Sequence, residues 1–294
     1  MEKIYFICDS PSDLRPSYIE GLNISVISAT VTIEGKDHME YPDIDPVAYW
    51  DTLERLSSVP QTSQAKLLDY ADAMRSARDA GFTHILVIPV STTGAGSMQN
   101  AKLAADMVRD ENPDAFPVIQ YIDSRSYAIM YGHIVLRSAQ MAKAGRSFAE
   151  IVQYAQDRVD RTEALFMVYS LKQMRKSGRI GGVQAFAGEA LGLRPILLCN
   201  DGRIGPIDKV RGEKKLLPRM LEILKERIVD PENQEVNIAY AKVPQEEIDA
   251  CESALRQQLG IKNIERYPIG ACVTTNTGPH CLSVVYHGAK RGRQ

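Results

Sequence analysis

Short turns rich in hydroxyl groups follow several apolar runs of this sequence. They are Asp9-Ser10, Thr62-Ser63, Ser91-Thr92-Thr93-Gly94-Ala95-Gly96-Ser97 and Asp123-Ser124. Ligands of open parallel sheets bind beyond the carboxyl ends of the strands, so such turns could line one rim. Hydroxyl donors, free backbone N–H groups and the start of a helix together favour an anion, most simply a carboxylate or a phosphate. Taken singly, each Ser or Thr is more simply interpreted as a helix cap.

Other kinds of chemistry have less support in the sequence. The pair Gly94 and Gly96 lacks the third glycine of a dinucleotide fingerprint, and no Walker phosphate loop is present. The five histidines show no metal-ligand spacing, and no GxSxG motif presents a nucleophilic serine. Asp9, Asp13 and Asp123 are as easily capping residues as catalysts. We therefore expect a binding protein without a metal or cofactor, and not an enzyme.

The composition, net charge and cysteine spacing bear on the class of protein, its compartment and its partners. The 294 residues are 44% hydrophobic and 24% charged, which is typical of a globular chain with a full core. A net charge of −2 gives no general attraction to nucleic acid or to anionic lipid. Five cysteines without CxxC spacing indicate reduced thiols, and no signal peptide or membrane-spanning run is visible. We expect a cytoplasmic protein without a nucleic-acid partner or stable membrane insertion.

The first half of the chain alternates strand-like and helix-like segments. We expect strands over 3–8, 24–33, 84–90 and 117–122, and helices over 45–56, 65–80, from 97 onward, and over 127–144. This alternation predicts a mostly parallel sheet covered on both faces. The helix over 127–144 is apolar on most sides, so it is either a core helix or a surface against which an apolar ligand lies.

The second half of the chain does not continue the regular alternation of strands and helices. A helix over 148–161 is followed by a strand over 164–170 and by a hairpin, 195–200 and 203–210, around the turn Asp201-Gly202. An amphipathic helix beginning at Leu216 and further strand and helix segments complete the chain. We place a boundary near residue 160, between an α/β parallel-sheet domain over 1–160 and an α+β domain over 161–294.

Seven short motifs occur in order along the chain. They are Asp9 to Leu14, Gln61 to Gln64, Ser91 to Ser97 with Gln99-Asn100-Ala101, Ile122 to Ser124, Ser177 to Ile180, Arg194 to Leu197, and Asp201-Gly202 through Arg211. Together they resemble the DegV family, the fatty-acid-binding subunits of bacterial fatty-acid kinase. The resemblance implies a two-domain DegV-like fold with a long-chain fatty acid in an inter-domain tunnel. It also implies that an ATP-dependent kinase phosphorylates the bound carboxylate to an acyl phosphate, which feeds phospholipid metabolism.

The resemblance assigns roles to particular residues. Carried over by motif, the carboxylate ligands are Thr62, Ser63 and Ser91. The full set expected to bind the ligand is Thr62, Ser63, Ser91, Thr92, Gly94, Gly96, Ser97 and Asn276. A cradle of neutral groups suits the task, because it releases the phosphorylated product without breaking a buried ion pair. Basic residues usually form a solvated face, but Arg179, Lys209 and Arg211 are candidates for contact with the kinase or the phosphate.

Two departures from the family pattern bear on function. The turn usually written Leu-Ser-Gly-Thr is Gly94 to Ser97 here, and the usual His-Thr-Gly-Pro-Gly begins with Asn276. Asparagine donates a hydrogen bond to a carboxylate but cannot carry a proton as imidazole does. Two alternatives therefore stay open: a lipid-sensing regulatory module without a kinase, and a substrate-binding subunit like that of dihydroxyacetone kinase, which uses a histidine.

Overall fold

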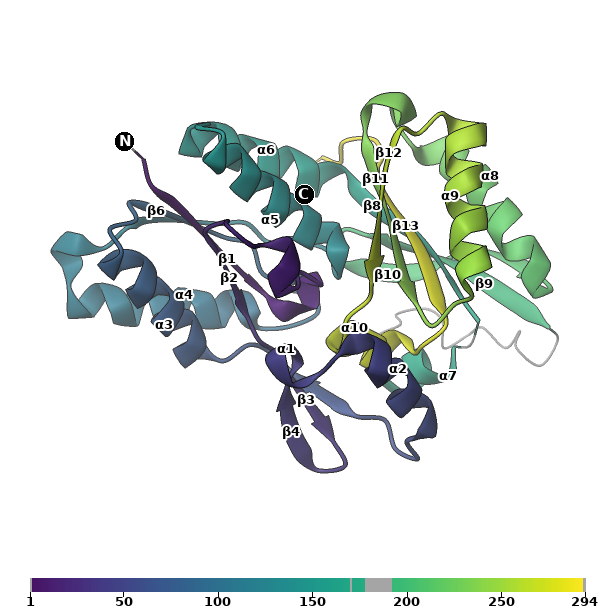
Figure 1. Cartoon of the computed structure of the whole chain (residues 1–294), viewed down its shortest axis with the longest axis horizontal. Helices are drawn as coiled ribbons and strands as arrows, with labels where there is room; N and C mark the ends of the chain where they lie inside the picture. Colours follow the sequence, from purple (N-terminus) through teal and green to yellow (C-terminus); the bar gives the residue numbers. More distant parts are fainter. Residues whose placement is uncertain (1, 170, 178–191, 293–294) are drawn as a thin grey trace.

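The computed structural model describes residues 2–169, 171–177 and 192–292. Two large sheets stand side by side, with helices α5 (Ile129–Lys143) and α6 (Phe148–Arg161) between them (Figure 1). A small three-stranded sheet lies below both in that view. The arrangement brings the ends of strands from both large sheets close together.

The first large sheet is parallel throughout. Its strands, in spatial order, are β2 (Ile24–Ile27), β1 (Ile4–Asp9), β6 (His84–Val87) and β7 (Val118–Tyr121). Helices α3 (Leu67–Asp79) and α4 (Ser97–Glu111) cover one face, where they pack on Ile7 and Ile85. Helix α5 covers the other face against Phe6 and Leu86. Burial on both faces explains the near-continuous apolar runs and confirms the expected parallel sheet.

The expected single strand over 24–33 is wrong. Strand β2 ends at Ile27, and β3 (Thr30–Ile33) begins a separate antiparallel sheet with β4 (Lys36–Met39) and β5 (Gln61–Ser63) in the order β4-β3-β5. Between the two strands, the Ala29 N–H donates to Ser10 Oγ (2.8 Å) and takes no part in a sheet ladder. Helices α1 (Glu40–Asp43) and α2 (Pro46–Arg55) follow, and Asp45 caps α2 by accepting from the Ala48 N–H.

The second large sheet is mixed, as an α+β arrangement requires. Its order is β10 (Arg203–Arg211), β9 (Leu193–Asn200), β8 (Thr162–Val168), β13 (Cys281–His287), β11 (Glu235–Ala241) and β12 (Asn263–Pro268). The described pairs are antiparallel except β11 with β12, and the expected hairpin around Asp201-Gly202 is confirmed. Helices α8 (Leu216–Arg227) and α9 (Gln245–Leu259) pack on one face. Two short helices, α7 (Lys172–Ser177) and α10 (Ala271–Thr277), lie at the lower end of this sheet in Figure 1, where α10 contacts both α7 and α2.

One hydrophobic cluster joins the two large sheets. It contains Phe6 of the first sheet, Tyr131 of α5, and Phe166 of the second sheet. The first sheet uses strands before residue 122 and the second uses strands after residue 161. The division near residue 160 stays a prediction, since α5 and α6 contribute to a core that both sheets share.

Helix α5 is pressed directly onto the turn that follows β1. A Cβ atom on Gly132 would overlap the carbonyl oxygen of Ser12, so only glycine allows this approach. This contact sets the distance between α5 and the turn that follows β1. Over the ranges that the structure describes, no helix is long and apolar enough to cross a membrane.

Candidate functional site

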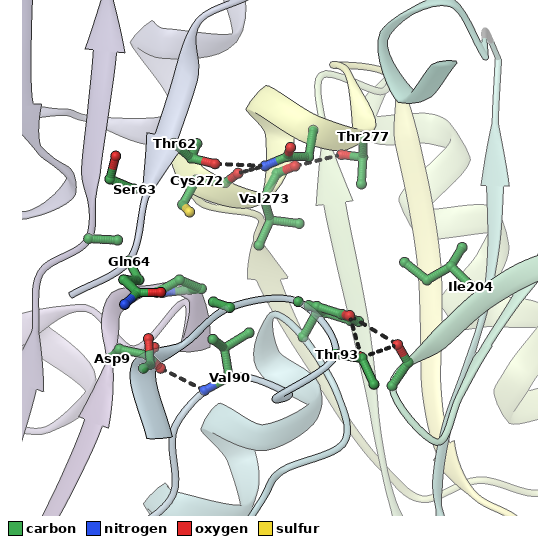
Figure 2. Close-up of a pocket in the computed structure, with 18 of the residues that line it drawn as sticks. Asp9, Thr62, Ser63, Gln64, Val90, Thr93, Ile204, Cys272, Val273 and Thr277 are labelled. Atoms are coloured by element: carbon green, nitrogen blue, oxygen red, sulfur yellow. Dashed lines mark hydrogen bonds between the residues drawn. The ribbon is translucent and has the colours of Figure 1, made fainter. Parts of the chain in front are cut away.

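A cavity of about 550 Å³ lies where the two large sheets and the small sheet meet (Figure 2). Its walls come from the end of β1, from β5, from the turn between β6 and α4, from α10 and from the start of β10. The residues that line it include Asp9, Thr62, Ser63, Gln64, Val90, Thr93, Gly94, Ser97, Tyr127, Met174, Arg203, Ile204, Cys272, Val273 and Asn276. This volume is in the range of small-molecule sites in proteins.

Asp9 ends β1 and brings a carboxyl group to the cavity. The side chain is fully buried, and its Oδ1 accepts from the Val90 N–H (2.8 Å) and from the Tyr131 hydroxyl (2.7 Å). Its Oδ2 has no hydrogen-bond partner among the described residues. Burial raises the pKa of Asp9 above its ordinary value, although nearby donors oppose the shift.

The turn after β6 is fastened to the tip of the β9–β10 hairpin. The Thr93 hydroxyl donates to the Gly202 carbonyl (2.7 Å), and Figure 2 marks hydrogen bonds between Thr93 and other lining residues. Thr93 Oγ1 also pairs with Ser91 Oγ (2.8 Å). Tyr127 donates to the same carbonyl (3.0 Å), while the Gly202 N–H donates to the Arg125 carbonyl (2.5 Å). Thr93 and Tyr127 therefore hold the hairpin tip at the cavity wall.

Asn276 and Thr62 face each other across the cavity edge. The Asn276 amide group donates to Thr62 Oγ1 (3.3 Å) and to the Cys272 carbonyl (2.8 Å) (Figure 2). Thr62 Oγ1 accepts in this contact, so its own hydroxyl hydrogen is free to donate elsewhere. Asn276 is thus placed to orient a hydroxyl donor.

Two buried carboxyl groups accept hydrogen bonds from the N-terminal end of α10. Glu40 accepts from the Cys272 N–H (2.7 Å) and from the Ser10 hydroxyl (2.6 Å), and Asp13 accepts from the Gly270 N–H (2.9 Å). Burial raises the pKa of Glu40 to about 7. It also raises the pKa of Asp13, with the nearby charge of Glu40 adding to the effect. These groups position the helix and are not among the residues that line the cavity.

The family relationship follows from sequence comparison. The family model described as "Uncharacterised protein, DegV family" matches residues 3–288. The chain belongs to the DegV family. A DegV domain-containing protein of Caldanaerobacter subterraneus subsp. tengcongensis is 31% identical over 286 residues, which are 97% of this chain and 99% of that protein.

Solved structures of DegV proteins share the whole fold. A stearic-acid-binding protein from Eubacterium ventriosum is 25% identical with a TM-score of 0.87, and the match covers 98% of each chain. DegV of Bacillus subtilis, described as a fatty-acid-binding protein, is 22% identical with a TM-score of 0.83, over 98% of this chain and all of that one. The two-sheet arrangement is therefore the DegV fold.

The predicted ligand-binding residues of this DegV chain fall into two groups. Thr62, Ser63, Gly94, Ser97 and Asn276 line the cavity. Three others are not among the lining residues, namely Ser91, Thr92 and Gly96. Ser91 is buried beside Thr93, Thr92 is exposed and bonded to Asp123, and the Gly96 N–H donates to Gln64 Oε1 (2.6 Å).

The two glycines of the DegV turn face protein side chains. A Cβ on Gly94 would lie 2.6 Å from the Tyr127 ring, and one on Gly96 would lie 2.7 Å from the Gln64 carboxamide. Their role is to let Tyr127 and Gln64 pack against the turn. The Gln64 contact also joins the end of β5 to the start of α4, so the polar side of the cavity is continuous from Thr62 to Ser97.

Two of the predicted basic contacts, Lys209 and Arg211, are not among the residues that line the cavity. Lys209 and Arg211 are exposed on β10, and Arg179 lies outside the described residues. The sequence interpretation missed Arg203 and Tyr127 as lining residues. It placed Asp9 among the turn residues that could line one rim and left a capping role for it open. Arg203 lies within the family motif that runs from Asp201-Gly202 through Arg211, and Tyr127 lies three positions after Ser124, the end of another motif.

Proposed function

We propose that this DegV protein binds a long-chain fatty acid in the cavity and presents its carboxylate to an ATP-dependent kinase. The observation that supports this most is the mixed lining of the cavity. Hydroxyl and amide groups of Thr62, Ser63 and Asn276 line it together with apolar side chains such as Met174, Ile204 and Val273. A carboxylate with a long hydrocarbon chain has the same two parts, and the related stearic-acid-binding protein shares the fold.

Thr62 would be the main donor to the carboxylate. Because Asn276 donates to Thr62 Oγ1, the Thr62 hydroxyl hydrogen is directed to another acceptor, and a carboxylate oxygen in the cavity would be one. Asn276 then acts through Thr62 as a positioning residue. Hydrogen bonds to a charged group are worth about 1.5–3 kcal/mol each, so a few neutral donors suffice to hold the head group.

The kinase step requires that the head group be reachable. A carboxylate oxygen would attack the γ-phosphorus of ATP, and the bond from that phosphorus to the bridging oxygen of ADP would break. Strand β10 is an edge of the second sheet, and it carries Arg203 at the cavity and Lys209 and Arg211 farther along. Exposed basic side chains two residues apart point to one side of a strand, where they suit an acidic or phosphate-bearing partner.

The first experiment tests for the ligand itself. Native mass spectrometry of the purified protein, followed by organic extraction, should reveal one fatty acid per chain. Thr62→Ala should lower the affinity for added stearic acid by roughly 10- to 100-fold, because one hydrogen bond to a charged group is lost. Thr52→Ala is the matched control, since the Thr52 hydroxyl bonds only the Ala48 carbonyl of its own helix among the described residues.

Each outcome decides between interpretations. A folded Thr62→Ala protein with undiminished affinity would remove Thr62 from the site, and a wild-type protein that refuses stearic acid would refute the fatty-acid function. Presentation of the bound carboxylate is tested by adding a bacterial fatty-acid kinase subunit. The double variant Lys209→Glu, Arg211→Glu should form acyl phosphate more slowly than the wild type and keep the same affinity for the fatty acid. Binding without any kinase-dependent phosphorylation would favour the lipid-sensing alternative.

A further inference from the structure

Two fully buried side chains that line the cavity each leave an oxygen atom unpaired. They are Asp9, through Oδ2, and Ser97, through Oγ, with no hydrogen-bond partner among the described residues. Ser97 lies beside both Asp9 and Tyr70, and its hydroxyl, as a nearby hydrogen-bond donor, favours the charged form of the Asp9 carboxyl group. An unsatisfied buried polar group is costly and therefore points to a missing partner.

The two oxygens of Asp9 have different surroundings. Oδ1 accepts from the Val90 N–H and the Tyr131 hydroxyl, so it serves as an acceptor in either protonation state. Oδ2 lies on the side toward Gln64 in Figure 2, away from Val90. A proton on the carboxyl group would therefore reside on Oδ2, where it makes Asp9 a hydrogen-bond donor.

Four titratable groups near Asp9 are each neutral or acidic, while Arg203 lines the same cavity. Cys8 of β1, Tyr70 of α3, Tyr131 of α5 and Glu40 of α1 all interact electrostatically with it. The thiol and the two phenols are neutral at physiological pH, and an ionised Glu40 would add a second negative charge. Burial already raises the pKa of Asp9, and an approaching ligand carboxylate would raise it further.

We propose that Asp9 holds a proton on Oδ2 in the fatty-acid complex and donates it, with the Ser97 hydroxyl, in hydrogen bonds to the ligand carboxylate. This inference rests on the proposed function, because it concerns the head group of the same ligand. One proton lies between the two carboxyl groups. The cavity therefore binds an ionised long-chain monocarboxylate while the Asp9 side chain is neutral. The start of α4 at Ser97 adds backbone N–H groups that also favour the anion.

Binding is then linked to pH through Asp9. Above the pKa of Asp9 in the free protein, each pH unit lowers the affinity up to about tenfold, because a proton must be taken up with the ligand. An alkyl sulfonate of equal chain length stays ionised throughout the working range, so it should show the same dependence. Because the sulfonate itself takes up no proton in this range, the same pH dependence with this ligand would show that the protein carries the proton.

The decisive test combines infrared spectroscopy with the variant Asp9→Asn. Asparagine keeps an acceptor for Val90 and Tyr131 and places an N–H donor where Oδ2 lies. With a fatty acid carrying a ¹³C carboxyl, the wild-type complex at neutral pH should show a protonated carboxyl band that Asp9→Asn lacks. The variant should bind within about threefold of wild-type affinity and without dependence on pH. Asp13→Asn is the control, because Asp13 binds the Gly270 N–H outside the cavity and its φ of 59° suits asparagine.

Three results would overturn the inference. A protonated carboxyl band that is the same in the wild-type and Asp9→Asn complexes would mean that Asp9 is ionised when the ligand is bound. A folded Asp9→Asn protein that loses more than about tenfold in affinity would mean that the site needs the charged carboxylate. Loss of the protonated band in Asp13→Asn alone would assign the proton to that residue. If neither the wild type nor the variants bind fatty acid, the proposed function fails first.

Discussion

Gly202 offers the sharpest test of how the hairpin tip is fastened to the cavity wall. Its φ is +73°, and a Cβ atom there would lie 2.7 Å from Thr93 Oγ1 and would also press on Ser91 Oγ. Both hydroxyls are held by hydrogen bonds, so neither can move aside freely. Gly202→Ala therefore combines an unfavourable backbone conformation with a steric overlap.

The magnitude follows from these two contributions. A left-handed conformation costs a non-glycine residue about 1–2 kcal/mol, and overfilling a packed contact costs about 1–3 kcal/mol. We expect Gly202→Ala to lower the free energy of unfolding by roughly 2–5 kcal/mol. The variants Gly212→Ala and Gly205→Ala separate the two contributions. Gly212 has a φ of +86° with nothing within 4 Å of its Cβ position, so its substitution tests the backbone conformation alone. Gly205 has neither a positive φ nor a close neighbour at its Cβ position.

Denaturant unfolding supplies the assay, because the single tryptophan, Trp50, is only 5% exposed and its fluorescence reports unfolding. Gly205→Ala should match the wild type, Gly212→Ala should lose about 1–2 kcal/mol, and Gly202→Ala should lose more than either. If Gly202→Ala and Gly212→Ala prove equally stable, the contact between hairpin tip and turn contributes nothing, and the argument for it is refuted.

Two further predictions concern groups behind the cavity wall. Glu40 is neutral more readily in the folded protein, so its stabilising effect is complete below its ordinary pKa of 4.5 and is lost as the pH rises through about 7. The free energy of unfolding should fall by up to about 3 kcal/mol over that interval, and Glu40→Gln, compared by urea unfolding across the same pH values, should remove this slope; equal slopes would contradict it. Ser91→Ala should cost about 1 kcal/mol of stability through its lost bond to Thr93, with fatty-acid affinity changed less than about threefold in a direct binding titration. A large loss of affinity at unchanged stability would instead place Ser91 in contact with the ligand.

The parts of the fold that local patterns encode could be predicted from the sequence. The alternating strands and helices of the first sheet and the hairpin around Asp201-Gly202 depend on apolar runs and turn residues that are neighbours in the chain. The small sheet could not be predicted in the same way. Strand β5 has only three polar residues, Gln61–Ser63, with no apolar alternation, and its pairing with β3 joins segments about thirty residues apart.

The candidate site shows the same limit at the level of single side chains. A run of three hydroxyl residues follows β6, and only the three-dimensional turn decides that Thr93 faces the cavity while Ser91 and Thr92 support it. Asp9 follows a strand as a capping residue would. Its partners Val90 and Tyr131 are 81 and 122 positions away, so its place at the cavity depends on contacts that no local pattern records.

The close approach at Gly132 has a consequence for how DegV sequences are compared. Any larger residue there would push α5 away from the turn at Ser12 and carry Asp9, three positions earlier, out of register with its partners. Such a chain would keep every side chain that lines the cavity and still present them wrongly. The ability to bind a ligand therefore depends partly on a helix position outside the cavity lining. A comparison of homologues should include the residue at this position as well as the residues that line the cavity.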